Sequence, residues 1–348
     1  MNADSSEEHP WGGASDMRGW AAELQHAADF AGFHESGAPP PLPQAGRRRL
    51  FRRFLLVSAY AGAAVALFAG GWFAHGAFQG GSPSTSETDQ LVGAVFPDDG
   101  VTLDVSWGDI PQRLVQEGVI DVEKFAAAAE AAGSPLTPDQ LALLAEGSDE
   151  PLTMDASNAY FLLDMLWALG LANKNAIITE GPMADRGWDQ AGNYASTGGW
   201  TLGVEPGPKY LASLELIRLT PEQQAVLDEV AFNSYRPCCG NMTAFPDCNH
   251  GMAALALAEL MASQGASADE IFQALKEISP FWYPNQYYQL ALYFDSQEQE
   301  WDDVDARLVM GGDFSSAQGS QQVSAWLQQE GIIGSGRPGE GKAGGCAP

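Results

Sequence analysis

The fold of this chain is organised around one apolar stretch, Met252-Ala253-Ala254-Leu255-Ala256-Leu257-Ala258-Glu259-Leu260-Met261-Ala262-Ser263. When this stretch is placed on a helix, apolar side chains point in nearly every direction, and a helix of this kind is buried inside a domain. Gln264-Gly265 follows directly, and a glycine just past the last turn is typical of a helix end. The sequence therefore predicts a buried helix that begins near His250, with the rest of the large domain packed around it.

Fifteen residues at the start of this helix, 236–250, hold three of the chain's four cysteines and one of its five histidines. The candidate ligands are Cys238, Cys239, Cys248 and His250. Thiolates and imidazole suit soft and borderline metals, and four of them equal the coordination number of tetrahedral zinc. The spacing Cys-Cys-x8-Cys-x-His matches no zinc-finger pattern. Two adjacent cysteines on one ion force a tight chelate, which leaves open that one of them bridges a second metal or is not a ligand. We expect these four residues to bind a transition metal ion for redox chemistry or metal handling, with zinc or copper favoured over an iron–sulfur cluster.

The same residues allow two other functions, which the sequence leaves open. In the first, Cys248 or one of the adjacent cysteines is the reactive thiol of an enzyme or redox relay, with His250 as its base. A helix N-terminus stabilises a thiolate, and Arg236 would add to this effect. In the second, Cys248 forms a disulfide with one of the adjacent cysteines and the other pairs with Cys346, which gives a stapled interaction domain.

Several other side chains near the cysteines are weaker candidates. Met242 and Met252 would favour Cu(I) if their thioethers were ligands, although such methionines more often fill gaps in a core. Either Asp247 or Asn249 is expected to cap the start of the buried helix. The candidate supporting or general-base carboxylates, each of which is more often solvated surface in so acidic a chain, are Asp185, Asp189, Glu205 and Glu259.

A membrane-spanning helix is predicted near the N-terminus. Residues 54–78 contain no Asp, Glu, Lys or Arg over 25 positions, which is long enough to cross a hydrocarbon core of roughly 30 Å. Residues 47–53 carry five arginines on the N-terminal side of this run, and positive charge of this kind stays in the cytoplasm. We therefore expect a single-pass signal anchor in a cell membrane, with residues 54–78 in the lipid bilayer, the main domain outside the cytoplasm and a membrane protein as a candidate partner.

The charge of the chain excludes one class of partner. Its formal net charge is −28, and from residue 79 onward 38 acidic residues stand against 11 basic ones. A field of this sign repels the phosphates of nucleic acids. We exclude nucleic acid as a partner and expect a small molecule or a metal ion as the ligand.

Composition divides the rest of the chain into further segments. Residues 1–46 are predicted to form a largely disordered cytoplasmic tail that ends in a proline-rich spacer. Residues 79–98 contain many Gly, Ser and Thr residues and are expected to be a flexible linker. A compact, mainly α-helical domain with the Cys/His site is expected over residues 99–335, and a disordered tail over 336–348.

Within residues 99–335 the sequence predicts little β structure. Apolar and polar residues alternate from Val101 to Trp107, which is typical of one half-buried strand. Helix starts are indicated by Thr137-Pro138, by Thr220-Pro221 and by Ser267 with Glu270. Further helices are expected over residues 110–117, 122–132 and 155–169, and after Pro284.

One long segment departs from the helical pattern. Asn173–Tyr210 covers 38 residues rich in Gly, Pro, Asn and Trp. Loops longer than about 15 residues in a compact domain are usually functional or disordered, and the aromatic residues Trp188, Tyr194 and Trp200 argue against disorder. We expect one long Gly/Trp-rich loop that helps to cover the metal site.

Overall fold

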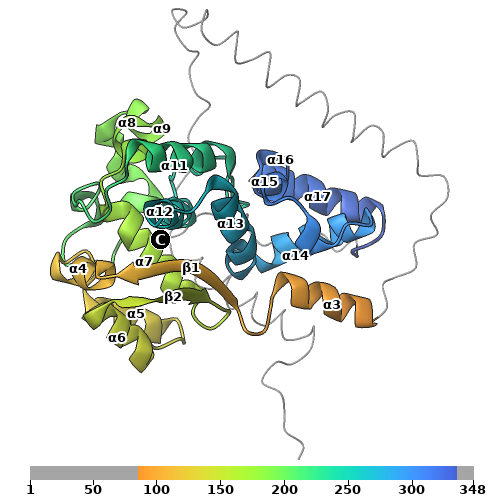
Figure 1. The fold of residues 1–348 in the computed structure, drawn as a ribbon, viewed down its shortest axis with the longest axis horizontal. Helices are drawn as coiled ribbons and strands as arrows, with labels where there is room; N and C mark the ends of the chain where they lie inside the picture. The colour runs from red at the N-terminus through yellow and green to blue at the C-terminus, as the bar shows by residue number, and fades with distance from the viewer. Residues whose placement is uncertain (1–84, 335–348) are drawn as a thin grey trace, which may run out of the picture. The chain divides into compact units, whose positions relative to one another are not determined.

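A computed structural model describes residues 85–334, which fall in one unit of mostly helical structure (Figure 1). The predicted mostly α fold with little β structure is confirmed for these residues. The predicted cytoplasmic tail, basic cluster and membrane span at 54–78 lie outside them, as does the tail at 336–348. Between residues 85 and 334, no helix combines the length and the apolar character that crossing a bilayer requires.

Both strands of the described chain lie in its first half. The elements there are α3 (Thr85–Val95), β1 (Val101–Gly108), α4 (Ile110–Gln116), α5 (Val122–Ala131), α6 (Pro138–Glu146), β2 (Ser148–Met154), α7 (Ala159–Ala172), α8 (Ala176–Glu180), α9 (Pro182–Asp185), η2 (Trp188–Asn193), α10 (Ala195–Gly198) and η3 (Gly207–Lys209). The second half is helical, with α11 (Pro221–Asn233), α12 (Asn249–Ser263), α13 (Ala268–Trp282), α14 (Pro284–Ser296), η4 (Trp301–Asp303), α15 (Ala306–Met310), α16 (Gly312–Ser315) and α17 (Ala317–Gln329).

Helix α12 is the buried element that the sequence predicts. Buried residues fill it from Gly251 to Ala262, and it packs along α7, which is buried over most of its own length. The two helices approach closely at Gly170, where an added Cβ would lie 2.5 Å from the carbonyl oxygen of Met252. In Figure 1 α12 is seen end-on, with α7 and α11 beside it. The prediction of a buried central helix is confirmed.

The expected strand is present, and it has a partner that the sequence analysis missed. β1 alternates buried and more exposed residues as predicted. It pairs antiparallel with β2, with Val101 opposite Met154 and Leu103 opposite Leu152, and the register shifts beyond Leu103. Only two residues of β2 are buried, and Pro151 is typical of an edge strand. The polar sequence of β2 is the reason why it gives no strand signal.

The predicted helix starts at Thr137, Thr220 and Ser267 are confirmed. In each case the side-chain oxygen accepts a hydrogen bond from the backbone N–H three residues later, and the Gln or Glu at that later position bonds back to the cap. This reciprocal arrangement satisfies two backbone donors that a helix end otherwise leaves unpaired. It fixes the starts of α6, α11 and α13.

Two predicted loops contain helical structure. The segment 79–98, expected as a flexible linker, includes α3, which packs against α14 and η4 and ends at the buried Val95. The segment 173–210 is not one long loop, because it is divided into α8, α9, η2, α10 and η3. Local interactions explain this: Asn175 caps α8, and the indole N–H of Trp200 donates to the carbonyl oxygen of Val119 at 2.9 Å. Composition alone did not reveal either contact.

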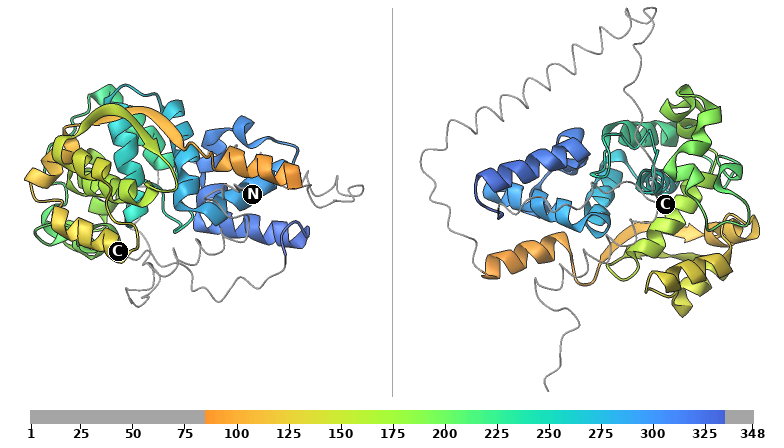
Figure 2. Two further views of the ribbon diagram at one scale, coloured as in Figure 1. Left: turned by 90° about the horizontal axis from the view of Figure 1, so that it is seen from below. Right: turned by 180° about the vertical axis from the view of Figure 1, so that it is seen from behind.

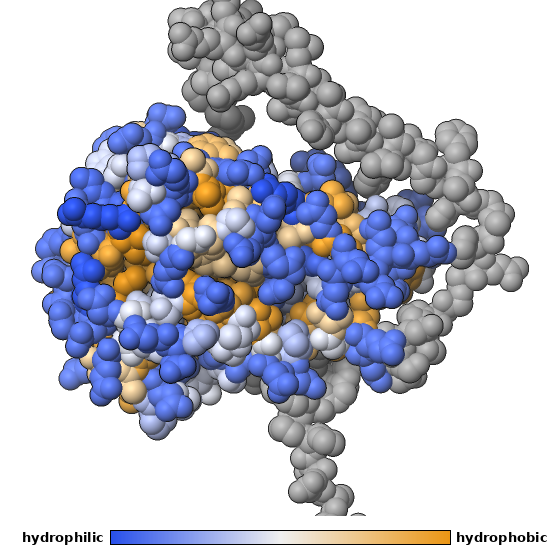
Figure 3. Space-filling model, viewed as in Figure 1, coloured by the Kyte–Doolittle hydropathy of each residue, from blue (hydrophilic) through white to orange (hydrophobic). Residues whose placement is uncertain are grey.

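The later helices gather on one side of the unit. α14 packs against α17 and α3, and α13 packs against α15. The two views in Figure 2 show these elements apart from α4, α5 and α6. The face drawn in Figure 3 is largely hydrophilic with apolar areas between polar residues, and the exposed large apolar side chains of the described chain come from separate elements. Single exposed apolar residues of this kind are normal on a soluble surface.

Candidate metal centre

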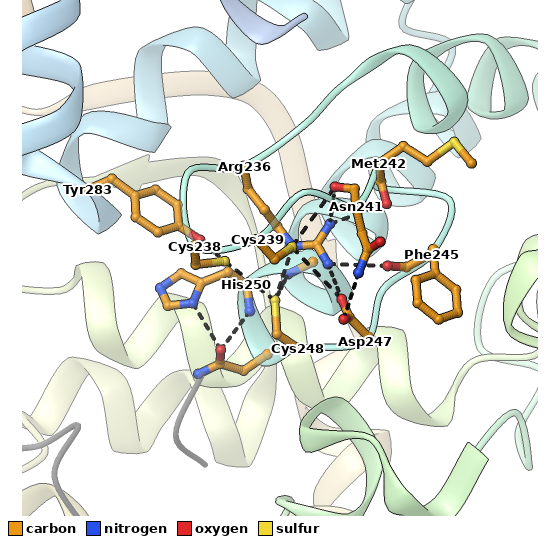
Figure 4. Close-up of polar contacts among 12 residues, drawn as sticks. Arg236, Cys238, Cys239, Asn241, Met242, Phe245, Asp247, Cys248, His250 and Tyr283 are labelled. Carbon is orange, nitrogen blue, oxygen red and sulfur yellow. Dashed lines mark hydrogen bonds and ion pairs between the residues drawn. The ribbon is translucent and has the colours of Figure 1, made fainter. Parts of the chain in front are cut away.

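The three cysteines of the described chain lie in the loop that joins α11 to α12, or at its end. The loop is closed at its base, because the backbone N–H of Thr243 donates to the carbonyl oxygen of Ser234 at 2.9 Å and their hydroxyl oxygens are 2.8 Å apart. Tyr235 and Met242 form an isolated antiparallel bridge just inside this point. The first two cysteines therefore turn back toward the third at the start of α12 (Figure 4).

The sulfur atoms of the three cysteines come together. The Sγ atoms of Cys238 and Cys248 are 3.6 Å apart, and all three Sγ atoms, including that of Cys239, lie within 4.8 Å of one another. Two thiolates bound at about 2.3 Å to a tetrahedral zinc ion would be about 3.8 Å apart, whereas the sulfurs of a disulfide are about 2.05 Å apart. The 3.6 Å separation of the Cys238 and Cys248 sulfurs is close to that of two ligands on one ion. This group can hold a metal ion.

The guanidinium of Arg236 organises the loop around these sulfurs. Its side chain is 3% exposed, and its Nε donates to the Sγ of Cys248 at 3.0 Å. The two terminal nitrogens donate to four other acceptors, which are the carbonyl oxygens of Asn241, Met242 and Phe245 and the carboxylate of Asp247. A guanidinium has five N–H donors in a fixed plane. Five acceptors surround it here, so Arg236 ties both ends of the loop to one planar group.

Charge in the loop is concentrated at Arg236 and the sulfurs. Burial lowers the pKa of Arg236, but negative charge on Cys248, Cys239, Cys238 and Asp247 outweighs burial, and the net pKa is raised. Hydrogen bonds with Cys238 and Cys248 raise the pKa of the Cys239 thiol, and burial raises it further. Arg236 is therefore positively charged, and the protonated form of Cys239 is favoured.

Cys248 itself caps α12, and the prediction of Asp247 or Asn249 as the cap is wrong. Its Sγ accepts a hydrogen bond from the backbone N–H of Gly251 at 3.4 Å. An added Cβ at Gly251 would lie 2.4 Å from the Cζ of Arg236, so glycine is required there for the guanidinium to lie against the helix. The positive end of the helix dipole and the guanidinium both stabilise a thiolate at this sulfur.

His250, the fourth predicted ligand, lies beside the sulfurs but outside their group. Its Nδ1 is 2.9 Å from the Oδ1 of Asn249, and its ring stands 4.7 Å from that of Tyr283. Burial lowers the pKa of His250 to about 4, so the imidazole is neutral at physiological pH. Within residues 85–334, the only set of three or more ligand atoms this close together consists of the three cysteines. The role of His250 as a ligand stays a prediction.

Tyr283 is a site residue that the sequence analysis does not identify. Its hydroxyl donates to the Sγ of Cys238 at 3.1 Å, and the side chain is 7% exposed. It comes from the junction of α13 and α14, 45 positions from Cys238. Its local sequence is the aromatic run 281–283 directly before Pro284, and such a run gives no indication of a bond to sulfur.

The weaker candidates named from the sequence have other surroundings. In Figure 4 the side chain of Met242 extends away from the sulfurs, and Met252 packs at the contact between α12 and α7. Asp185, Asp189 and Glu205 are exposed. Glu259 is buried, but its Oε1 accepts hydrogen bonds from Asn173 and Asn175. None of the four carboxylates is a member of the sulfur group.

The segment 173–210 contacts the loop at the residues just before α12. The ring of Tyr194 meets that of Phe245 edge-on at 5.4 Å, and the guanidinium of Arg186 lies over the same ring at 4.6 Å. The backbone N–H of Ser196 donates to the carbonyl oxygen of Asp247 at 3.1 Å. These contacts support the last part of the loop, on the Asp247 side of Arg236.

Comparisons with known proteins add no further assignment, because no protein family, curated protein or solved structure matches this chain.

Proposed function

We propose that this protein binds a thiophilic transition metal ion, zinc or copper, through Cys238, Cys239 and Cys248, and that it does so as a membrane-anchored protein outside the cytoplasm. The single observation that carries the proposal is the convergence of three Sγ atoms within 4.8 Å of one another. Three soft donors at this spacing suit zinc and Cu(I). A protein that binds such an ion through three thiolates would be suited to metal handling or to redox transfer.

The surroundings of the sulfurs favour an ion over a substrate. Cys248 is 1% exposed, whereas Cys238 and Cys239 are partly exposed. A nucleophilic thiol must reach the atom that it attacks, and the Cys248 sulfur has no such access. A small ion can enter from the side of Cys238 and Cys239. This supports metal binding over thiol catalysis at Cys248.

Arg236 and the start of α12 supply what a metal–thiolate centre needs around it. Groups that donate hydrogen bonds to metal ligands orient them and tune the metal. The Nε of Arg236 and the backbone N–H of Gly251 donate to Cys248, and the hydroxyl of Tyr283 donates to Cys238. Each of these donors also offsets negative charge on a thiolate. This supports a centre in which the cysteines stay deprotonated on the ion.

The membrane location in this proposal is supported by sequence alone. Residues 54–78 form an uncharged run that follows five arginines in residues 47–53. The arginines favour a cytoplasmic N-terminus, and the metal-binding domain would then face the outside of the membrane. Thiols in such a compartment usually oxidise, and a bound metal would protect these cysteines from oxidation.

The test is elemental analysis of the purified full-length protein by plasma mass spectrometry, with a count of free thiols in denaturant before and after chelation. We expect about one metal ion per chain and its loss in Cys248→Ser. Cys346→Ser is the matched control and keeps the metal. His250→Ala decides whether the imidazole is a fourth ligand, since it loses metal only in that case.

Two results would contradict the proposal. A metal-free protein whose thiols appear only after reduction would be a disulfide-stapled domain. A metal-free protein with free thiols, one of which reacts with iodoacetamide faster than the others near neutral pH, would be a thiol enzyme or redox relay.

A further inference from the structure

The number of ligands at the centre restricts the ion further than its softness does. Three sulfurs converge, and within the described part of the chain no imidazole or carboxylate joins all three at the same spacing. Structural zinc is almost always four-coordinate. Trivalent arsenic and antimony, in contrast, are satisfied by three thiolates in a pyramid, because a lone pair occupies the fourth direction. The donor set suits these elements without any added ligand.

The charge around the sulfurs points the same way. Arg236 and Asp247 form an ion pair at 2.5 Å, and together they carry no net charge. Three thiolates therefore leave a net charge of −2 with a monovalent ion, −1 with a divalent ion and zero with a trivalent one. Net charge is costly to keep where the surroundings are buried, and both Cys248 and Arg236 are nearly inaccessible to solvent. A trivalent centre is neutral in this setting.

We propose, on the basis of the function proposed above, that Cys238, Cys239 and Cys248 bind trivalent arsenic or antimony as a three-thiolate complex. The incoming species is the neutral trihydroxide. Each of the three cysteine thiols replaces one hydroxide, so that three metalloid–sulfur bonds form, three metalloid–oxygen bonds break and three water molecules leave. Each thiol proton leaves with the hydroxide that its sulfur replaces, as water, and no electron is transferred because neither the metalloid nor the sulfurs change oxidation state.

The exchange can begin at the end of the loop that carries Cys238 and Cys239. Cys238 and Cys239 are partly exposed, adjacent in sequence and able to bind first, whereas Cys248 is fixed by Arg236 and Gly251. The final bond to Cys248 closes the complex against the start of α12. Tyr283 donates to Cys238 from the other side. Binding is therefore stronger than that of an ordinary adjacent pair of thiols, since the third sulfur is already in place.

The test is titration of the reduced full-length protein with arsenite, followed by the thiolate-to-arsenic absorption band in the ultraviolet and by X-ray absorption at the arsenic edge. We expect one arsenic per chain with three sulfur neighbours and no oxygen neighbour. Arsenite should also displace zinc from the loaded protein. Each of Cys238→Ser, Cys239→Ser and Cys248→Ser should weaken arsenite binding by about 100-fold or more, because a linked third contact adds affinity of this order.

Cys346→Ser is the matched control, and its affinity for arsenite should equal that of the unaltered chain. Circular dichroism of each variant separates loss of ligand from loss of fold. An arsenic atom with two sulfurs and one oxygen, or full binding in a folded Cys248→Ser variant, would overturn this inference. If zinc or copper binds and arsenite does not, the inference fails and the proposed function stands. If none of the three ions binds, both fail.

Discussion

The Arg236 guanidinium contacts one sulfur, three carbonyl oxygens and one carboxylate in the loop between α11 and α12. Without it, each of those acceptors would lose a hydrogen bond inside the protein, which is costly. The loop could not then hold Cys248 and the two earlier cysteines at a fixed separation. At the scale of single residues, Arg236 therefore links Cys248 to the part of the loop that carries the other two candidate metal ligands.

Arg236→Lys tests this role. Lysine keeps the charge but offers three donors on a flexible stem, so it cannot reproduce a planar set of five contacts. We expect zinc affinity to fall by roughly 10- to 100-fold, as for other groups that orient metal ligands. Competition with a chromophoric chelator measures the zinc affinity of each variant. Arg218→Lys is the control, because the Arg218 side chain is 80% exposed; equal losses in both variants would refute the role of Arg236.

Glu259 gives a prediction about pH. Its carboxylate is 2% exposed, and burial raises its pKa from 4.5 to about 7 despite hydrogen bonds from Asn175 and Asn173. Because the folded state holds the proton more tightly than the unfolded state, this group favours folding fully below pH 4.5. That contribution is lost between pH 4.5 and about 7, and amounts to about 3 kcal/mol.

Glu259→Gln removes the charge and keeps an oxygen for the two amides. Relative to the unaltered chain, the free energy of unfolding of this variant should therefore rise as the pH increases from 4.5 to about 7, and stay constant above that. Urea unfolding at pH 5 and pH 8 measures the difference. Glu150→Gln, at an exposed position of β2, should show no such trend. A difference in unfolding free energy between Glu259→Gln and the unaltered chain that is the same at pH 5 and pH 8 would contradict the prediction.

The sequence made some of the site residues predictable and others not. The cysteines were found because thiols are rare in this chain and cluster at the start of an apolar helix. Residues close in sequence to one another are easily grouped. Tyr283 reaches Cys238 from another helix, and nothing in its local sequence specifies that contact. The placement of His250 was also beyond the sequence, because it depends on the rotamer that Asn249 and Tyr283 favour.

At the scale of elements, the contact between α7 and α12 sets the position of the site. An added Cβ at Gly170 would lie 2.5 Å from the carbonyl oxygen of Met252 and 2.9 Å from its Cγ. The backbones of the two helices can approach this closely only because residue 170 has no side chain. The start of α12, which carries Cys248, is held against α7 by this contact.

Gly170→Ala tests this contact between α7 and α12, because alanine has the higher helix propensity but adds a Cβ that clashes with Met252. Alanine is favoured over glycine in a helix by about 1 kcal/mol, but the clash with Met252 should outweigh this and destabilise the protein by about 1–3 kcal/mol. Gly93→Ala in α3 is the matched control, because nothing lies within 4 Å of an added Cβ there, and it should be neutral or stabilising. Urea unfolding of both variants measures the difference; a stable Gly170→Ala would contradict the packing.

Elements with strong local signals were predictable from the sequence, and elements defined by distant contacts were not. Thr137, Thr220 and Ser267 start helices through bonds within four residues. β2 is polar and forms because β1 lies beside it. The short helices of 173–210 depend on anchors such as Trp200, whose partner Val119 is 81 positions away. Such contacts leave no periodic pattern in the sequence.

At the scale of the whole molecule, the cysteine loop joins the helices around α12 to those at the C-terminal end. The backbone N–H of Ala317, the first residue of α17, donates to the carbonyl oxygen of Cys239 at 2.9 Å. The backbone N–H of Tyr235 donates to the carbonyl oxygen of Met310, the last residue of α15, at 2.8 Å. If the loop binds an ion as proposed, we therefore expect binding to stabilise contacts made by distant helices.

Amide hydrogen exchange on the full-length protein, with and without zinc, tests this coupling. At a free zinc concentration of about 100 times Kd, binding stabilises the folded form by about 2.7 kcal/mol, so amides that open with the loop should exchange up to about 100-fold more slowly. We expect this at Ala317 and Tyr235. The ladder between β1 and β2 is held by its own pairing and should change little.

Slowing confined to residues 238–248 would mean that the effect of the ion is local to the site. Equal slowing at every amide would mean that exchange reports only global unfolding. In Cys248→Ser zinc should leave all these rates unchanged, because the ion no longer links the loop to α12.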